Sequence, residues 1–191
     1  MRNHVSLALL PAIASAVAMA QTAATPPAAT PAAPAAAAAM TAARGPSLAL
    51  AMEAAQTAID MCKGLGANVA VSVVDSAGVL KLMLASDGAF AKGVVTSTAK
   101  AVTAKELGMP ISDIFHQMKT DAALAARIKA NPAYVVGQGG LPLRVGNEVI
   151  GAIGVGGAVG VRGQDELYPV IPGRDEQCAR AAVEKIRDRL Q

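Results

Sequence analysis

The sequence predicts an α/β fold of the α+β type, a single domain in which about five mostly antiparallel strands carry flanking helices. Two pairs of apolar runs, 69–74 with 79–85 and 141–145 with 148–155, are each separated by a tight turn. Tight turns join antiparallel strands, and parallel strands need longer crossovers. Segments with helical spacing lie before, between and after these pairs. The glycines of 139–158 indicate strands whose backbone closely approaches another group.

The first helix is expected to begin after Ser47, a good N-cap, and to end at Gly64 and Gly66. Its apolar residues recur at helical spacing and should form the buried face. These residues are Met52, Ala55, Ile59 and Cys62.

The first hairpin joins its two strands through Asp75-Ser76-Ala77-Gly78 and ends at Asp87-Gly88. Aspartate before a turn glycine commonly accepts hydrogen bonds from its own turn backbone. Asp75 and Asp87 are therefore expected to cap turns.

A long helix over 90–107 carries few charges, which predicts that neighbouring elements bury it on most sides. Gly108 and Pro110 end it. Shorter helices are expected over 112–119 and 121–130.

A short strand is expected at 134–136, ahead of the second hairpin. The hairpin turn is Gly146-Asn147, in which the glycine accepts a positive φ. A final helix follows, with Asp175 and Glu176 near its start and basic residues near its end, as the helix dipole prefers.

The N-terminal 46 residues are expected to lie outside this domain. Residues 1–20 have the charged, apolar and small-residue order of a secretory signal peptide. Residues 21–46 consist almost wholly of Ala, Pro and Thr, which predicts a disordered linker. The domain then spans 47–191, and we expect a periplasmic or secreted protein without a membrane span.

Charge and aromatic content argue against a nucleic-acid partner. The chain has 17 Lys+Arg and 14 Asp+Glu, and a net charge of +3. The basic residues are scattered, and two Phe, two Tyr and no Trp leave little aromatic surface for stacking bases.

The two cysteines, Cys62 and Cys178, fall in predicted helices near the two ends of the domain. An exported chain can keep a disulfide between them. Two small buried apolar side chains are an equally good interpretation. Two cysteines and the one histidine left after export cannot furnish a usual structural zinc site unless carboxylates join in, and no metal site is predicted.

Several motifs together resemble the GlcG/HbpS family of haem-binding domains over nearly all of 47–191. They are 74–78 (VDSAG), 87–88 (DG), 99–104 (AKAVTA), 139–142 (GGLP), 151–158 (GAIGVGGA) and 175–179 (DEQCA).

The resemblance implies a five-stranded antiparallel sheet with flanking helices, a homo-oligomer, and haem as ligand or substrate for some members. Residues 159–174 depart from the pattern, because the family usually has a much shorter loop there. A longer loop beside the glycine-rich strands can cover a site or change a subunit contact.

The candidate ligand site combines the central helix with the glycine-rich strands. Thr96, Lys100 and Thr103 share one face of the helix, and Lys100 is suited to pair with a propionate or a small carboxylate. Gly139 and Gly140 offer backbone N–H groups to an anion.

A purely structural role for the same helix residues stays open. In that case Lys100 reaches solvent or pairs with Asp75 or Asp87, and the threonines bond back to their own helix.

Two residues are candidates for a haem-iron ligand. Thr103 matches the position of a threonine in haem-binding relatives, and His116 is the one histidine that remains after export. A single histidine on a short helix is more often a structural residue.

The sequence therefore predicts an exported small-molecule-binding protein, most simply for haem, with its cleft between the central helix and the glycine-rich strands. No catalytic constellation is visible. A slow enzyme acting on haem or a small hydroxy acid is one alternative, which turnover would reveal. A non-catalytic assembly or sensor-accessory module is another, in which Gly154→Leu breaks the oligomer and Lys100→Ala leaves ligand affinity unchanged.

Overall fold

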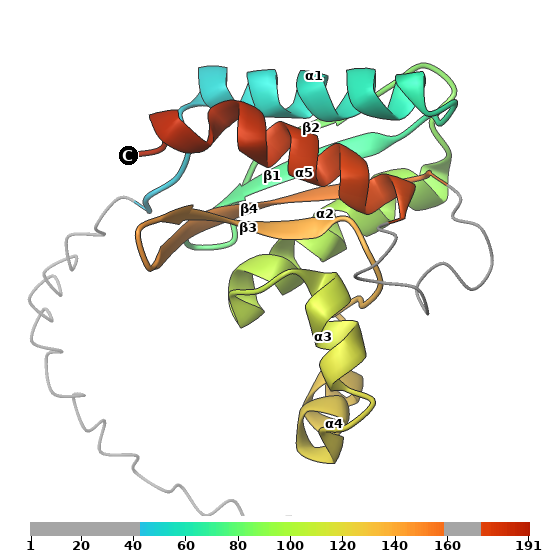
Figure 1. Ribbon diagram of the computed structural model, residues 1–191, viewed down its shortest axis with the longest axis vertical. Helices are drawn as coiled ribbons and strands as arrows, with labels where there is room; N and C mark the ends of the chain where they lie inside the picture. Colours follow the sequence, from blue (N-terminus) through green and yellow to red (C-terminus); the bar gives the residue numbers. More distant parts are fainter. Residues whose placement is uncertain (1–42, 159–172) are drawn as a thin grey trace, which may run out of the picture. The chain divides into compact units, whose positions relative to one another are not determined.

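A four-stranded antiparallel sheet, ordered β2-β1-β4-β3, forms the centre of the domain (Figure 1). The computed structural model describes residues 43–158 and 173–191, which belong to one compact unit. The elements are α1 (Leu48–Gly64), β1 (Ala70–Asp75), β2 (Leu80–Ala85), α2 (Ala91–Leu107), α3 (Ile111–Gln117), α4 (Ala122–Ala130), β3 (Gly140–Val145), β4 (Glu148–Gly156) and α5 (Arg174–Ile186), followed by a short 3-10 turn, Arg187–Arg189.

Both predicted hairpins are confirmed. Strand β1 pairs antiparallel with β2 and with β4, and β3 pairs antiparallel with β4. Gly146 in the second turn has a φ of +57°. In the first turn, Asp75 Oδ1 accepts hydrogen bonds from the N–H groups of Ala77 and Val79 at 2.9 and 3.0 Å, so its capping role is also confirmed.

The expected fifth strand at 134–136 is wrong for the described chain. These residues are irregular, and the Val135 N–H donates to the Thr103 hydroxyl at 3.0 Å instead of to a strand. The segment is therefore held against α2, and β3 remains one edge of the sheet.

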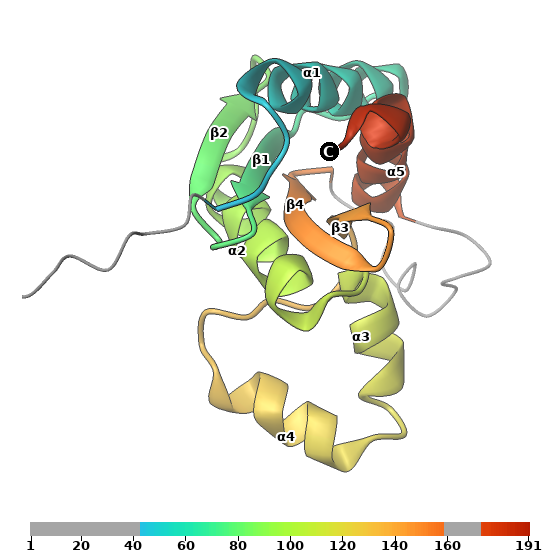
Figure 2. The ribbon, with the colours of Figure 1, turned by 90° about the vertical axis from the view of Figure 1, so that its left-hand side faces the viewer.

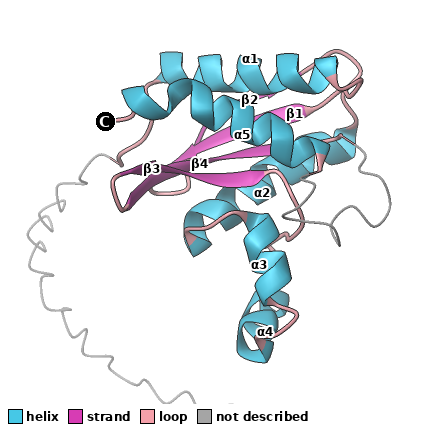
Figure 3. Cartoon of the chain, in the orientation of Figure 1, coloured by secondary structure: helices cyan, strands magenta, loops and turns pink. Residues whose placement is uncertain are grey.

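Helices cover both faces of the sheet (Figures 2 and 3). Helices α1 and α5 lie side by side on one face, where they enclose the larger buried apolar cluster with alternate residues of β1 and β4, such as Val71 and Ile153. Helix α2 covers the opposite face, and Ala101 and Ala104 pack there with Ile111 of α3. None of the described helices is long and apolar enough to cross a membrane.

The close approach predicted for the glycine-rich strands is made by α2 itself. A Cβ on Gly154 would lie 2.6 Å from the Ala101 amide nitrogen, and a Cβ on Gly140 would lie 2.7 Å from the Lys100 carbonyl oxygen. At Gly156 it would lie 2.6 Å from the Gly93 carbonyl oxygen. The glycines thus let the helix backbone rest directly on the sheet at these three positions.

Two packing expectations fail at single residues. Met52, expected on the buried face of α1, is 57% exposed, whereas Ala55, Ile59 and Cys62 are buried as predicted. Helix α2 is less buried than predicted, because few of its residues are fully buried and Val95 is 71% exposed; the buried ones are Gly93, Ser97, Ala101, Thr103 and Ala104.

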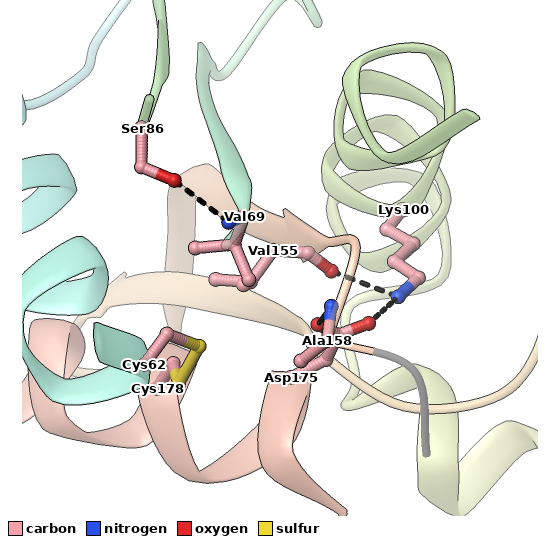
Figure 4. Close-up of a disulfide and its surroundings, with 8 residues drawn as sticks. All are labelled: Cys62, Val69, Ser86, Lys100, Val155, Ala158, Asp175 and Cys178. Atoms are coloured by element: carbon pink, nitrogen blue, oxygen red, sulfur yellow. Dashed lines mark hydrogen bonds and ion pairs between the residues drawn. A yellow bond between two sulfur atoms is a disulfide. The ribbon is translucent and has the colours of Figure 1, made fainter. Parts of the chain in front are cut away.

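The two cysteines form a disulfide. Cys62 of α1 and Cys178 of α5 are joined with a Cα–Cα distance of 5.5 Å, which closes a sequence separation of 116 residues (Figure 4). This decides between the two interpretations left open by the sequence.

The described chain contacts the domain from residue 44 onward. The Arg44 carbonyl accepts a hydrogen bond from the Ser76 N–H at 2.8 Å, and Pro46 is buried. The predicted signal peptide, most of the predicted linker, and residues 159–172 of the predicted long loop lie outside the described residues.

Candidate functional site

One cavity lies between the central helix α2, the segment that precedes β3 and the segment that follows β4. It has a volume of about 640 Å³, within the usual range of small-molecule sites. We call it the α2 cavity. Its lining residues are Phe90, Lys92, Gly93, Thr96, Lys100, Val135, Val136, Gly157, Ala158 and Asp175.

A lysine–aspartate pair forms one wall of the α2 cavity (Figure 4). The Lys100 ammonium lies 2.6 Å from Asp175 Oδ2 and donates to the Val155 carbonyl at 2.8 Å. Both side chains are only 13% exposed. Asp175 Oδ1 also accepts the Ala158 N–H at 3.0 Å. The pair therefore ties together α2, the end of β4 and the start of α5.

The partner of Lys100 differs from both candidates suggested by the sequence. It is Asp175, not Asp75 or Asp87. Sequence reasoning assigned Asp175 only to the helix dipole, although the residue stands in one of the motifs that carry the family resemblance. That motif, 175–179, is the feature of the sequence that could have pointed to Asp175 as a site residue.

The two threonines of the predicted polar face have different surroundings. Thr96 lines the α2 cavity. Thr103 is fully buried outside the lining; its hydroxyl donates to the Ala99 carbonyl at 2.8 Å and accepts from Val135 N–H. Thr103 thus fixes the segment that carries Val135 and Val136, two apolar residues of the cavity wall.

Gly139 and Gly140 lie behind the cavity wall. The Gly139 N–H donates to Glu176 Oε2 at 2.9 Å, and Gly140 packs against the backbone of Lys100. Neither glycine lines the α2 cavity, and the Gly139 amide already has an anionic partner inside the protein.

Glu176 is a buried carboxylate that the sequence did not single out as part of the site. Its side chain is fully buried, with Oε1 2.9 Å from an Arg180 nitrogen and 3.3 Å from the Ser112 hydroxyl. Burial raises the pKa of this carboxyl above its usual value, and the Gly139 N–H and Arg180 partly oppose that shift. Glu176 connects α5 to α3 and to the start of β3.

His116, the other candidate iron ligand, also lies outside the lining. It is half-buried on α3, in edge-on contact with the Phe115 ring at 5.6 Å between ring centroids, and does not line the α2 cavity. Within residues 43–158 and 173–191, no three His, Cys, Asp or Glu side chains gather as a metal site.

The α2 cavity suits the porphyrin part of haem better than its iron. Phe90, Val135, Val136 and Ala158 offer apolar surface, and two lysines offer charge. Among the residues that the structure describes, the lining contains no His, Cys, Met or Tyr, the usual axial ligands.

A second cavity of about 680 Å³ lies over α5 and β3 and includes Arg144, Arg180 and Arg187. These arginines are already engaged. Arg144 donates to the carbonyls of Asn147 and Gly108, Arg180 pairs with Glu176, and Arg187 pairs with Glu184. None of the predicted ligand-binding residues lines this cavity.

Comparison with known proteins identifies relatives of the whole domain. A family model described as "haem degrading protein HbpS-like" matches residues 47–184. No curated protein sequence matches the chain.

Three solved structures share the fold. A double mutant of Streptomyces reticuli HbpS is 30% identical, with a TM-score of 0.62 over 78% of this chain and 98% of that chain. Klebsiella pneumoniae protein ORFY is 27% identical, with a TM-score of 0.61 over 73% of this chain and 88% of that chain. The PduOC–haem complex is 20% identical, with a TM-score of 0.61 over 73% of this chain and 94% of that chain, a likeness of fold alone.

Proposed function

The chain belongs to the family of haem-degrading HbpS-like proteins, and from that premise we propose that it is an exported protein that binds haem in the α2 cavity. The observation that carries this proposal is the cavity itself. It combines a largely apolar wall with a lysine–aspartate pair and a second lysine, a composition suited to an amphipathic anion.

The chain's own residues would hold the ligand by packing and by charge. Val135 and Val136 offer an apolar face to the macrocycle, and Thr96 offers a hydroxyl. The Lys100–Asp175 pair keeps the cavity wall in place by joining three elements. Bound haem would supply an iron centre whose reactivity depends on its axial ligand and on the polarity around it. Thr103 and His116 remain candidate iron ligands only if the cavity wall rearranges.

Family membership and one solved structure of similar fold support haem as the ligand. The family model is described by haem degradation, and PduOC has been crystallised with haem. Other small anionic ligands that combine a carboxylate with an apolar body meet the same chemical requirements.

Export is supported by two features of the chain. Its first 20 residues have the order of a signal peptide. The Cys62–Cys178 disulfide also fits an oxidising compartment such as the periplasm or the extracellular space. We therefore propose a periplasmic or secreted protein. A homo-oligomer is proposed on exposed apolar side chains such as Val79 and Val95, which are 59% and 71% exposed.

Slow degradation of haem is the second candidate, favoured by the family description. In the described part of the cavity, the carboxylate and the innermost ammonium are bonded to each other, which does not favour acid–base catalysis. Binding without turnover is therefore our first proposal.

A haemin titration followed in the Soret region tests the proposal. We expect a saturable shift in the unchanged protein. Val136→Trp should remove the shift by filling the cavity, whereas Lys129→Trp, at an exposed position of α4 outside the lining, should keep it. Loss of the Soret band with release of an open-chain tetrapyrrole, in the presence of O₂ and an electron donor, would favour the enzyme. No saturable shift would reject haem.

A further inference from the structure

Two lysines of α2, Lys92 and Lys100, line the α2 cavity, and they differ in whether a carboxylate neutralises their charge. Lys100 has one oxygen of Asp175 at 2.6 Å and a backbone carbonyl at 2.8 Å. Two of its three ammonium hydrogens are thus used inside the protein. A ligand carboxylate brought to Lys100 would also approach the Asp175 carboxylate, and the like-charge repulsion would offset much of the attraction.

Lys92 lies in the first turn of α2, is exposed, and makes no ion pair with any residue of 43–158 or 173–191. The first turn of α2 contains no acidic residue that could neutralise it. Phe90, two residues earlier, lines the same cavity and is 62% exposed. A large aromatic ring and a lysine without an ion-pair partner in the described chain therefore both line the cavity near the start of α2.

The distance between the two lysines determines how long a ligand must be to reach from Lys100 to Lys92. Eight residues separate Lys92 from Lys100, which is about 12 Å along a helix axis. Val135 and Val136 belong to the same lining. One end of the cavity thus carries an unbalanced positive charge, and the other end carries a neutralised pair.

We propose that Lys92, with Phe90 beside it, recognises the anionic group of the ligand, and that Lys100 is a positioning residue that stays bound to Asp175. The inference rests on the proposed function only for the choice of cavity. It adds the ligand class, an amphipathic anion at least about 1 nm long, and its direction. For haem, Lys92 would hold a propionate group at this end of the cavity.

The test compares charged and neutral forms of one ligand. Haemin and haemin dimethyl ester, which lacks the propionate charges, are titrated into the protein, into Lys92→Gln and into Lys129→Gln. Lys129 is an exposed lysine of α4 outside the lining and serves as the matched control. We expect Lys92→Gln to weaken haemin about fivefold, the upper end for one exposed ion pair, and to leave the ester unchanged. Lys129→Gln should change neither affinity.

Equal haemin affinity for Lys92→Gln and the unchanged protein would overturn the inference, as would an equal loss for haemin and its ester. If haemin does not bind at all, the proposed function fails, and 8-anilinonaphthalene-1-sulfonate becomes the probe. Its fluorescence should then show binding that Val136→Trp abolishes and Lys92→Gln weakens. Failure of either variant to weaken this probe would overturn the recognition role independently of haem.

Discussion

At the scale of single residues, the α2 cavity depends on an ion pair whose members stand 75 positions apart in the sequence. Lys100 and Asp175 are mostly removed from water, so each needs the other to offset its lost hydration. Removing Asp175 leaves the nearly buried Lys100 ammonium without its carboxylate, which costs more than removing both charges.

We expect Asp175→Asn to lower the free energy of unfolding by about 2–3 kcal/mol, somewhat less than for a fully buried pair. Adding Lys100→Gln to it should recover part of that loss, because the uncompensated ammonium disappears. Urea denaturation of the two single variants and the double variant gives the coupling free energy. Additive losses would show that the two charges do not depend on each other.

The buried Glu176 carboxyl should make the free energy of unfolding depend on pH. Its raised pKa means that the folded protein holds this proton more tightly than the unfolded chain does. The resulting stabilisation is complete below the ordinary value of 4.5 and is lost as the pH rises through the folded pKa. Glu176→Gln cannot titrate, so its stability should improve relative to the unchanged protein as the pH rises.

Urea denaturation from about pH 4 to 7 measures this difference. Glu184→Gln is the control, because its carboxylate on the same helix is 67% exposed. Parallel stability curves for Glu176→Gln and the unchanged protein would contradict the role of burial.

Among these residues, the sequence could predict the candidates but not their partners. Helical spacing puts Lys100 and Thr96 on one helix face, and both line the cavity. Asp175 was missed as the partner of Lys100, because nothing local indicates that the start of α5 lies beside the middle of α2. The partner of Thr103 was also not predictable, since its hydroxyl accepts a hydrogen bond from Val135 N–H, which is 32 residues away.

At the scale of elements, the sheet and α2 are brought together by glycines. Gly140, Gly154 and Gly156 remove the side chains that would otherwise separate the helix backbone from β3 and β4. Glycine spacing predicted a close approach, and hairpin turns predicted which strands pair. The sequence could not predict which group approaches the strands. The α2 backbone, a ligand and a second subunit would each need glycines at these positions.

Gly154→Ala should therefore destabilise the protein by about 3 kcal/mol or more, because the new Cβ meets α2 backbone, which cannot rotate away. Gly64→Ala is the matched control. Gly64 ends α1, an alanine Cβ there would have no neighbouring atom within 4 Å, and the change should stabilise by about 0.5–1 kcal/mol. Thermal or urea unfolding distinguishes the two. A mild effect at Gly154 would mean that α2 can move off the sheet.

The sequence also predicted every described helix to within a few residues. Caps account for much of this, since Ser47 accepts the Leu50 N–H at 3.2 Å and Asp121 accepts the Leu124 N–H at 2.9 Å. The failed strand at 134–136 has the right residue types for a strand. Its backbone is instead held by α2, a tertiary contact that overrides propensity.

At the scale of the whole molecule, the disulfide joins the first and last helices of the domain. Cys62 and Cys178 cross-link α1 and α5 on the face opposite α2, and Asp175 lies one turn before Cys178 (Figure 4). Pairing was left open by the sequence, because spacing alone does not place two helix faces together.

Loss of this disulfide should lower the free energy of unfolding by about 3–5 kcal/mol, because a loop of this length restricts the unfolded chain strongly. Denaturation with and without dithiothreitol measures the loss. The double variant Cys62→Ala/Cys178→Ala is the control and should not respond to the reductant. Identical stability of the oxidised and reduced protein would contradict the expected stabilisation.

Paramagnetic NMR with haemin tests most directly whether the α2 cavity is the ligand site. Ferric haem broadens amide signals that lie close to the iron, so the broadened set locates the ligand in the unchanged protein. We predict saturable broadening at Gly93, Thr96, Val136 and Gly157. Broadening centred on Arg144 and Arg187 of the second cavity would contradict the claim.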